Sequence, residues 1–160
     1  MIKERFESSE KPFDWHPVCS SRLVLEGIDI GRIPDDIDIV IKNSDISLVE
    51  KVLGLESLKP KATGTPRIQK NCLTYRFNFA DEGLNWKPEI HLIAESEEGL
   101  RLQNKAQVIE KDFGGITLSV FPLEIEKRVY EELGKNTRWQ EKAQLRISQI
   151  NDYLKKSQLR

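Results

Sequence analysis

Two aspartates separated by a single residue are the feature of the sequence best suited to metal chemistry. Asp36 and Asp38 lie in the stretch Asp36-Ile-Asp-Ile-Val-Ile41, where isoleucines alternate with the acidic residues. In a β-strand, residues at i and i+2 point to the same side and lie roughly 6.6 Å apart along the chain. Both carboxylates can then converge on divalent cations, as in two-metal sites for phosphoryl transfer. The pattern therefore predicts a strand whose polar face carries a metal site.

A third acidic ligand is expected on another strand. Glu89 begins the segment Glu89-Ile-His-Leu-Ile-Ala94, whose apolar residues can face the core while Glu89 and His91 face the opposite way. Glu89 is therefore predicted to be the third ligand, provided that the two strands are neighbours. Three further acids are less favoured because they occupy apparent bends: Asp81, Glu82 and Glu95.

Each of these residues also has a simpler interpretation. An Asp-x-Asp pair is often solvated charge in a loop, and Glu89 can equally be an exposed charge because the register of its strand is open. His91 is expected to lie beside the carboxylates. The chain has no Cys-His cluster, so zinc is not favoured, and Cys19 near His16 shows only proximity in sequence.

The elements that would position these residues are both strands and helices. Strands are predicted at 72–79, 89–94 and 116–121 from their β-branched and aromatic content, and Trp15–Glu26 is predicted to hold a short element before a loop. The range 99–114 is left unassigned. Three helices are predicted, one after Asn43 or Ser44 with Gly54 as its stop, one with Pro122 in its first turn and Gly134 at its end, and one that opens on a Thr137–Gln140 capping box.

This succession predicts a single α+β domain over residues 15–160, preceded by a polar N-terminal extension at residues 1–14. The domain would contain a small mixed β-sheet that carries the carboxylates, flanking helices, and a C-terminal helical pair. A chain of 160 residues is long enough for one sizeable core and too short for two ordinary domains.

The charge balance gives no general attraction to nucleic acid, since 25 Lys and Arg face 26 Asp and Glu. RNA would need a local patch, and the basic segment Lys59–Arg67 is either such a foothold or an exposed hairpin loop. Cys19 and Cys72 form no disulfide framework, and neither a secretory signal nor an apolar run of membrane-spanning length is present. A cytoplasmic protein without a membrane partner is expected.

The residues before the Asp-x-Asp pair complete a recognisable pattern. Cys19-Ser20-Ser21, Gly27 and Arg32 precede Asp36-Ile37-Asp38, and the stretch R-I-P-D-D-I-D is similar to R-x-(S/T)-x-D-x-D. This order resembles the minimal nucleotidyltransferases of the polymerase-beta-like superfamily. Pro34 stands where the family has a hydroxyl residue, and Ser20-Ser21 stands where it has Gly-Gly or Gly-Ser.

The resemblance implies a nucleotidyltransferase-like fold and a reaction. An acceptor hydroxyl on RNA, a protein or a small molecule would attack the α-phosphate of a nucleoside triphosphate, with release of pyrophosphate. Asp36, Asp38 and Glu89 would hold Mg²⁺ or Mn²⁺. The implied nucleotide-binding residues are Ser20 and Ser21 near the phosphates, Arg32 organising the Asp-x-Asp loop, and Lys127 offsetting phosphate charge.

A second hypothesis is a catalytically inactive module with this fold that binds nucleic acid or a protein partner. The altered glycine signature motivates it, because Ser20-Ser21 lacks the backbone freedom of glycine. Relatives of this minimal kind sometimes act as toxins paired with an antitoxin, so the resemblance also implies an antitoxin-like protein partner.

Overall fold

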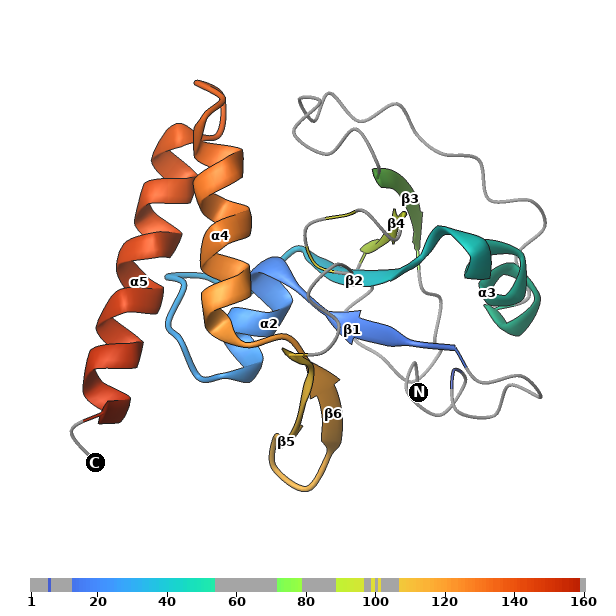
Figure 1. The fold of residues 1–160 in the computed structure, drawn as a ribbon, viewed down its shortest axis with the longest axis horizontal. Coiled ribbons are helices and arrows are strands. Elements are labelled where there is room, and N and C mark those ends of the chain that lie inside the picture. The colour runs from blue at the N-terminus through green and yellow to red at the C-terminus, as the bar shows by residue number, and fades with distance from the viewer. Residues whose placement is uncertain are drawn as a thin grey trace.

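The structure is a computed structural model that describes residues 6, 13–53, 72–78, 89–96, 99, 101 and 107–158 (Figure 1). Its elements, in chain order, are β1 (Trp15–Pro17), α2 (Cys19–Leu25), β2 (Asp36–Lys42), the 3₁₀ turn η1 (Asn43–Asp45), α3 (Ile46–Leu53), β3 (Cys72–Asn78), β4 (Glu89–Glu95), β5 (Ile109–Asp112), β6 (Thr117–Val120), α4 (Leu123–Gly134) and α5 (Gln140–Gln158).

Four strands form a mixed sheet in the order β1-β2-β4-β3. The central strands β2 and β4 are parallel, whereas β1 pairs with β2 and β3 pairs with β4 in antiparallel fashion. Strands β5 and β6 form a separate antiparallel hairpin, whose turn contains Gly114 and Gly115 at φ values of +68° and +89°. The small mixed sheet that the sequence predicts is therefore confirmed.

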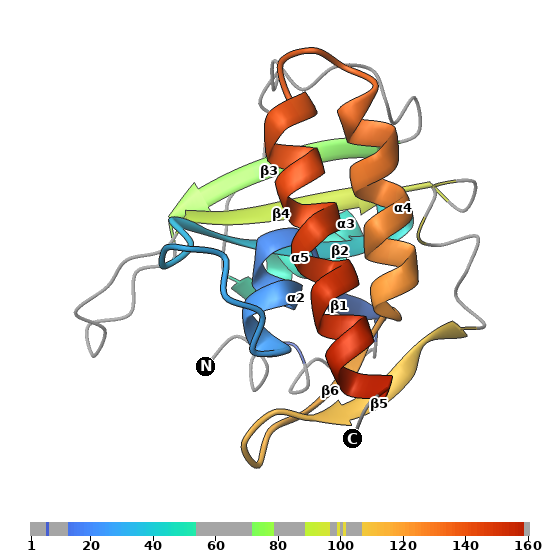
Figure 2. The same ribbon diagram turned by 90° about the vertical axis from the view of Figure 1, so that its left-hand side faces the viewer.

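The two faces of the sheet carry different residues because side chains alternate along each strand. Ile39, Ile41, Ile90 and Leu92 are buried in one core cluster, which also contains Val49 of α3. The opposite face carries Val40, which packs with Phe121 and Ile125 in a second cluster, and it is the face to which Asp36 and Asp38 belong. Helices α2, α4 and α5 lie on one side of the sheet and α3 on the other (Figures 1 and 2).

The C-terminal helical pair is present and packs as its apolar stripes indicate. Val129 of α4 is buried, and Ala143 and Ile150 of α5 are buried in a third cluster with residues of α2 and α4. The two helices approach closely at Gly134, where an added Cβ atom would lie 3.2 Å from the Cβ atom of Ala143. Gly134 is the last residue of α4 and Pro122 is its N-cap.

The predicted capping box at Thr137 and Gln140 is wrong. Helix α5 begins at Gln140, so Thr137 lies in the turn before it. Asn136 satisfies the backbone there instead, since its side-chain Oδ1 accepts the Arg138 N–H at 3.0 Å and its carbonyl accepts the Trp139 N–H at 2.9 Å. An asparagine side chain readily makes such a local turn, which competes with a threonine cap one residue later.

Several other predictions are refined. The segment Trp15–Glu26 contains β1 and α2, and β5 lies within the range that the sequence left unassigned. Phe6, which belongs to the predicted N-terminal extension, is buried with its ring centroid 5.0 Å from that of Phe13. Gly54 and the basic segment 59–67 lie outside the described residues. None of the helices in the described ranges is long and apolar enough to cross a membrane.

Candidate metal centre

The carboxylates of Asp36 and Asp38 meet the imidazole of His91 where β2 and β4 run side by side. The parallel register places Asp36 opposite Glu89 and Asp38 opposite His91. His91 Nδ1 lies 3.2 Å from Asp36 Oδ2 and 3.3 Å from Asp38 Oδ1. One donor atom from each of the three residues lies within 4.8 Å of the others, and all three side chains are half-buried. The two strands are therefore neighbours, which is the condition on which the choice of Glu89 rested. We refer to Asp36, Asp38 and His91 as the Asp36–Asp38–His91 cluster.

Glu89 lies at the edge of this cluster, behind the histidine. Its Oε2 is 2.8 Å from His91 Nε2, on the side of the ring away from the two aspartates. Arg76 of β3 approaches the same carboxylate, with Nη1 3.9 Å from Oε2. The imidazole thus lies between Glu89 and the aspartates. The role of Glu89 as a direct metal ligand stays a prediction.

The charges in the cluster shift the proton affinity of its members. Burial raises the pKa of Asp36, and the neighbouring charge of Asp38 raises it further, while His91 and Lys142 act in the opposite direction. Burial opposes protonation of His91, but hydrogen bonds to Asp38 and Glu89 and the charges of both aspartates outweigh it and raise the pKa of His91. The cluster therefore attracts positive charge, whether a proton or a cation.

Helix α2 holds the Asp-x-Asp strand in place through Ser21. The Asp38 N–H donates to Ser21 Oγ at 2.9 Å, and the Asp38 carbonyl accepts the Val18 N–H at 3.0 Å. Ser20 is buried, with 5% of its surface exposed. The resemblance implies that both serines approach phosphates. Their placement shows Ser21 bound to the strand backbone, and a phosphate contact of either residue stays a prediction.

A buried ion network fixes the N-terminus of α2. Glu126 of α4 accepts the Cys19 N–H at 2.9 Å, and Arg101 contacts both Glu126 and Glu95 at 3.2 Å. Cys19 has φ +53°, a left-handed conformation that its backbone bond to Glu126 helps to hold. The network ties β4, α2 and α4 together next to the Asp36–Asp38–His91 cluster. The contacts of Glu126 could not be read from the sequence because its partners Cys19 and Arg101 are 107 and 25 residues away.

The other two implied nucleotide-binding residues are placed differently. Arg32 is 53% exposed and forms a surface ion pair with Asp35. Lys127 is half-buried on α4, and within the described part of the chain no hydrogen bond or ion pair joins it to the Asp36–Asp38–His91 cluster. The structure leaves the roles of both as predictions.

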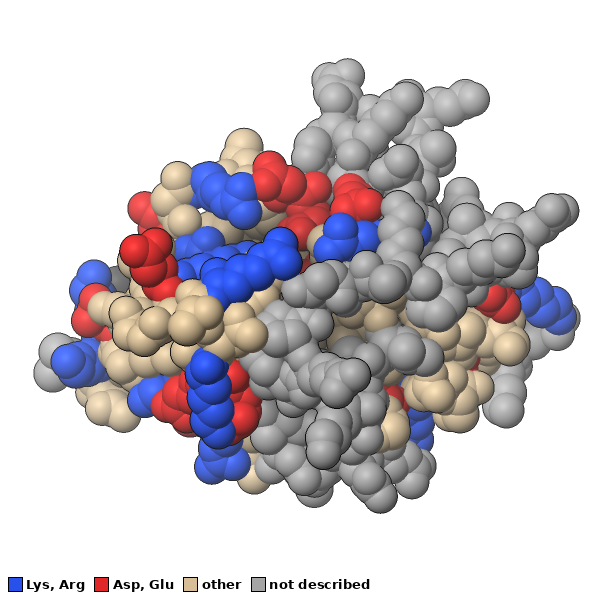
Figure 3. Space-filling view, turned by 90° about the horizontal axis from the view of Figure 1, so that it is seen from above, with Lys and Arg blue, Asp and Glu red and all other residues tan. Residues whose placement is uncertain are grey.

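Lys142 is the basic residue near the cluster that the sequence analysis missed. It lies in the first turn of α5, and its charge lowers the pKa of Asp36. Lys142 Nζ and Arg138 Cζ also lie 5.4 and 5.6 Å from the ring centroid of Trp139. The face seen in Figure 3 shows Lys and Arg side chains next to Asp and Glu side chains at the helical end of the molecule. No sequence signal indicates that a charge on this helix acts on Asp36, so Lys142 could not have been chosen.

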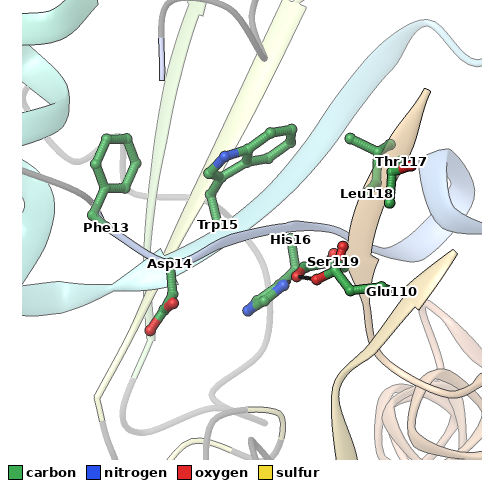
Figure 4. A pocket seen from close by; sticks show the side chains of 8 residues that line it. All are labelled: Phe13, Asp14, Trp15, His16, Glu110, Thr117, Leu118 and Ser119. Carbon is green, nitrogen blue, oxygen red and sulfur yellow. Dashed lines mark hydrogen bonds between the residues drawn. The ribbon is translucent and has the colours of Figure 1, made fainter. Parts of the chain in front are cut away.

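A separate pocket of about 250 Å³ lies between β1 and the β5–β6 hairpin (Figure 4). His16 Nδ1 is 3.0 Å from the Ser119 carbonyl there, and no member of the Asp36–Asp38–His91 cluster lines it. The lining residues are Phe13, Asp14, Trp15, His16, Glu110, Thr117, Leu118 and Ser119.

Comparison with known proteins places the fold. The chain matches the crystal structure of a "putative nucleotidyltransferase" from Thermotoga maritima with a TM-score of 0.56, over 94% of this chain and 91% of that one. The chain has a nucleotidyltransferase-like fold. The two sequences are 15% identical, so the likeness concerns the fold. No protein-family model and no curated protein matches the sequence.

Among the residues that the structure describes, the Asp36–Asp38–His91 cluster is a group of donor atoms with the chemistry to hold a divalent cation. Carboxylate oxygens suit Mg²⁺ and Mn²⁺, and an imidazole nitrogen suits the later first-row metals. The half-buried position of the cluster leaves it open to a ligand from solvent. The residues present therefore fit a metal ion.

Proposed function

We propose that the protein transfers a nucleotidyl group from a nucleoside triphosphate to an acceptor hydroxyl, with a divalent cation held by Asp36 and Asp38. The observation that carries this proposal is the meeting of the two aspartates with His91 on a nucleotidyltransferase-like fold. The fold alone would not support an activity, because one fold serves many functions. The carboxylate and imidazole donors on the paired strands β2 and β4 add the capacity to bind a metal ion.

The bound cation would neutralise charge on the α-phosphate and on the pyrophosphate leaving group. Asp36 and Asp38 would hold it at a fixed distance from the sheet, since their backbone belongs to a paired strand and Ser21 anchors the Asp38 N–H. This rigidity matters because small displacements of reacting groups cost large factors in rate.

Lys142 supports the binding of a triphosphate at the same place. Its charge acts on Asp36 from the first turn of α5. A polyanion between the cluster and α5 would then contact the metal on one side and an ammonium group on the other. We propose Lys142 as a phosphate contact, in addition to the implied Lys127.

A specific observation favours the alternative of an inactive binding module. The hydroxyl of Ser21 accepts a hydrogen bond from the Asp38 N–H and Ser20 is buried, so the two serines that the resemblance assigns to the phosphates already serve packing in α2. In this alternative the fold would bind nucleic acid or a protein partner without transfer.

The two functions separate in an assay with labelled nucleoside triphosphates, Mg²⁺ or Mn²⁺, and cellular RNA, protein and small-molecule fractions as acceptors. The enzyme transfers label and releases pyrophosphate, and Asp36→Asn or Asp38→Asn reduces transfer by more than about 100-fold because even outer-shell partners of a metal are worth 10- to 100-fold. Asp152→Asn, which removes an exposed carboxylate of α5, is the matched control. Nucleotide binding without transfer would support the module.

A further inference from the structure

The histidine of the Asp36–Asp38–His91 cluster is engaged on both ring nitrogens. Nδ1 faces the two aspartates at 3.2 and 3.3 Å, and Nε2 faces Glu89 at 2.8 Å. A carboxylate that accepts the Nε2–H fixes the orientation of the ring and leaves Nδ1 directed at the other ligands. Glu89 is itself approached by Arg76, whose Nη1 lies 3.9 Å from Oε2 of the same carboxylate.

The distances from His91 Nδ1 to the two carboxylates are close to those between neighbouring donors in one coordination shell. Two donors bound at right angles to an ion roughly 2.1 Å away are about 3.0 Å apart. The separations of His91 Nδ1 from Asp36 Oδ2 and Asp38 Oδ1 exceed this by a few tenths of an ångström. An ion can therefore replace the Nδ1 proton, which passes to solvent, with only small side-chain movements.

We propose that His91 Nδ1 is a direct metal ligand, that Glu89 acts behind it as a positioning residue, and that the site consequently prefers a first-row transition-metal ion such as Mn²⁺ over Mg²⁺. Mg²⁺ favours all-oxygen surroundings, whereas imidazole nitrogen strengthens the binding of transition-metal ions. This inference rests on the proposed metal-dependent function, and it assigns the identity of the metal and the third ligand.

The experiment must distinguish a nitrogen ligand from an oxygen ligand on the metal ion. Metal-free full-length protein is titrated with Mn²⁺ and separately with Mg²⁺ by calorimetry, without nucleotide. Pulsed electron paramagnetic resonance of the Mn²⁺ complex reports whether a nitrogen nucleus is coupled to the ion. The variants are His91→Asp, which keeps three ligands but makes all of them oxygen donors, and Glu89→Gln, with Asp152→Asn as control.

The wild-type protein and the control should show nitrogen coupling and bind Mn²⁺ more tightly than Mg²⁺. His91→Asp should lose the coupling and lower the Mn²⁺ to Mg²⁺ affinity ratio by about tenfold or more. Glu89→Gln should keep the coupling and weaken Mn²⁺ binding by roughly 10- to 100-fold, as loss of an outer-shell partner does. The wild-type spectrum and the Glu89→Gln titration do not depend on His91→Asp, so the inference can still be tested if His91→Asp folds poorly.

Absence of nitrogen coupling in the wild-type complex would overturn the inference, as would equal losses of Mn²⁺ and Mg²⁺ affinity in His91→Asp. The proposed function fails separately. Transfer of label with Mg²⁺ and no nitrogen coupling would leave the function and remove this inference, whereas nitrogen-coupled Mn²⁺ without any nucleotide transfer would do the reverse.

Discussion

Replacing Ser21 by alanine distinguishes a structural hydroxyl from a phosphate-binding one. In the folded protein, Ser21 Oγ accepts the Asp38 N–H at 2.9 Å, in a half-buried setting. Alanine keeps the helix and removes only the acceptor, so the Asp38 N–H loses its partner. If the hydroxyl serves the fold, the metal-free protein loses stability. If it serves a phosphate, only nucleotide affinity falls.

The size of the effect follows from the burial of that N–H group. An N–H left without its partner costs about 1 to 2 kcal/mol when partly shielded from water. For a chain of this length each kcal/mol shifts the melting temperature by about 2 to 4 °C, so Ser21→Ala should lower it by roughly 2 to 8 °C. The Asp38 carboxylate shares the disturbed backbone, and metal affinity should fall with stability.

The assay is thermal unfolding of metal-free Ser21→Ala beside wild type, followed by calorimetric titration with Mn²⁺ and then with a nucleoside triphosphate. Ser148→Ala is the matched control, because Ser148 is an exposed serine of α5. A Ser21→Ala protein that melts within about 1 °C of wild type but binds nucleoside triphosphate more weakly would refute the structural role of the hydroxyl. It would instead support the phosphate contact that the family resemblance implies.

Three further predictions concern the charged groups around the cluster. Arg101→Met leaves two buried carboxylates without their cation and should cost about 3 to 5 kcal/mol in urea unfolding; an unchanged midpoint would contradict the role of the network. The pKa of His91 is raised in the folded state, so the folded protein holds the imidazole proton more tightly than the unfolded chain does. The stabilisation from protonated His91 is therefore present below the ordinary histidine pKa of about 6.5 and is lost as pH rises through the pKa of the folded state. NMR titration of the metal-free protein should place the His91 midpoint above the ordinary value, and a midpoint below it would contradict this prediction. Lys142→Ala should weaken metal-dependent nucleotide binding by about three- to tenfold and Lys127→Ala by less, since the charge of Lys142 acts on Asp36. Calorimetric titration of both variants checks this order, and the reverse order would favour Lys127 as the phosphate contact.

The central part of the fold could be predicted from the sequence because it rests on local alternation. Isoleucines at every second position of β2 place Asp36 and Asp38 on the other face, and Glu89-Ile-His-Leu repeats that pattern on β4. The apolar spacing of α5, with Ala143 and Ile150 buried, likewise predicted a packed helix.

The rest depends on contacts between distant segments. Arg101 bonds to carboxylates of β4 and α4, and the charge of Lys142 acts on Asp36 from α5. Phe6 is buried with its ring against that of Phe13. None of these has a periodic signal. Which residue of β4 faces each aspartate depended on register, which the sequence leaves open and the pairing of β2 with β4 decides.

The most direct measurement of the central claim is calorimetric titration of nucleoside triphosphate into the wild-type protein and its Asp36→Asn and Asp38→Asn variants, with and without Mn²⁺ or Mg²⁺. The account predicts binding that requires the divalent ion and is strongly weakened in both variants. Metal-independent binding of equal strength in all three proteins would contradict it.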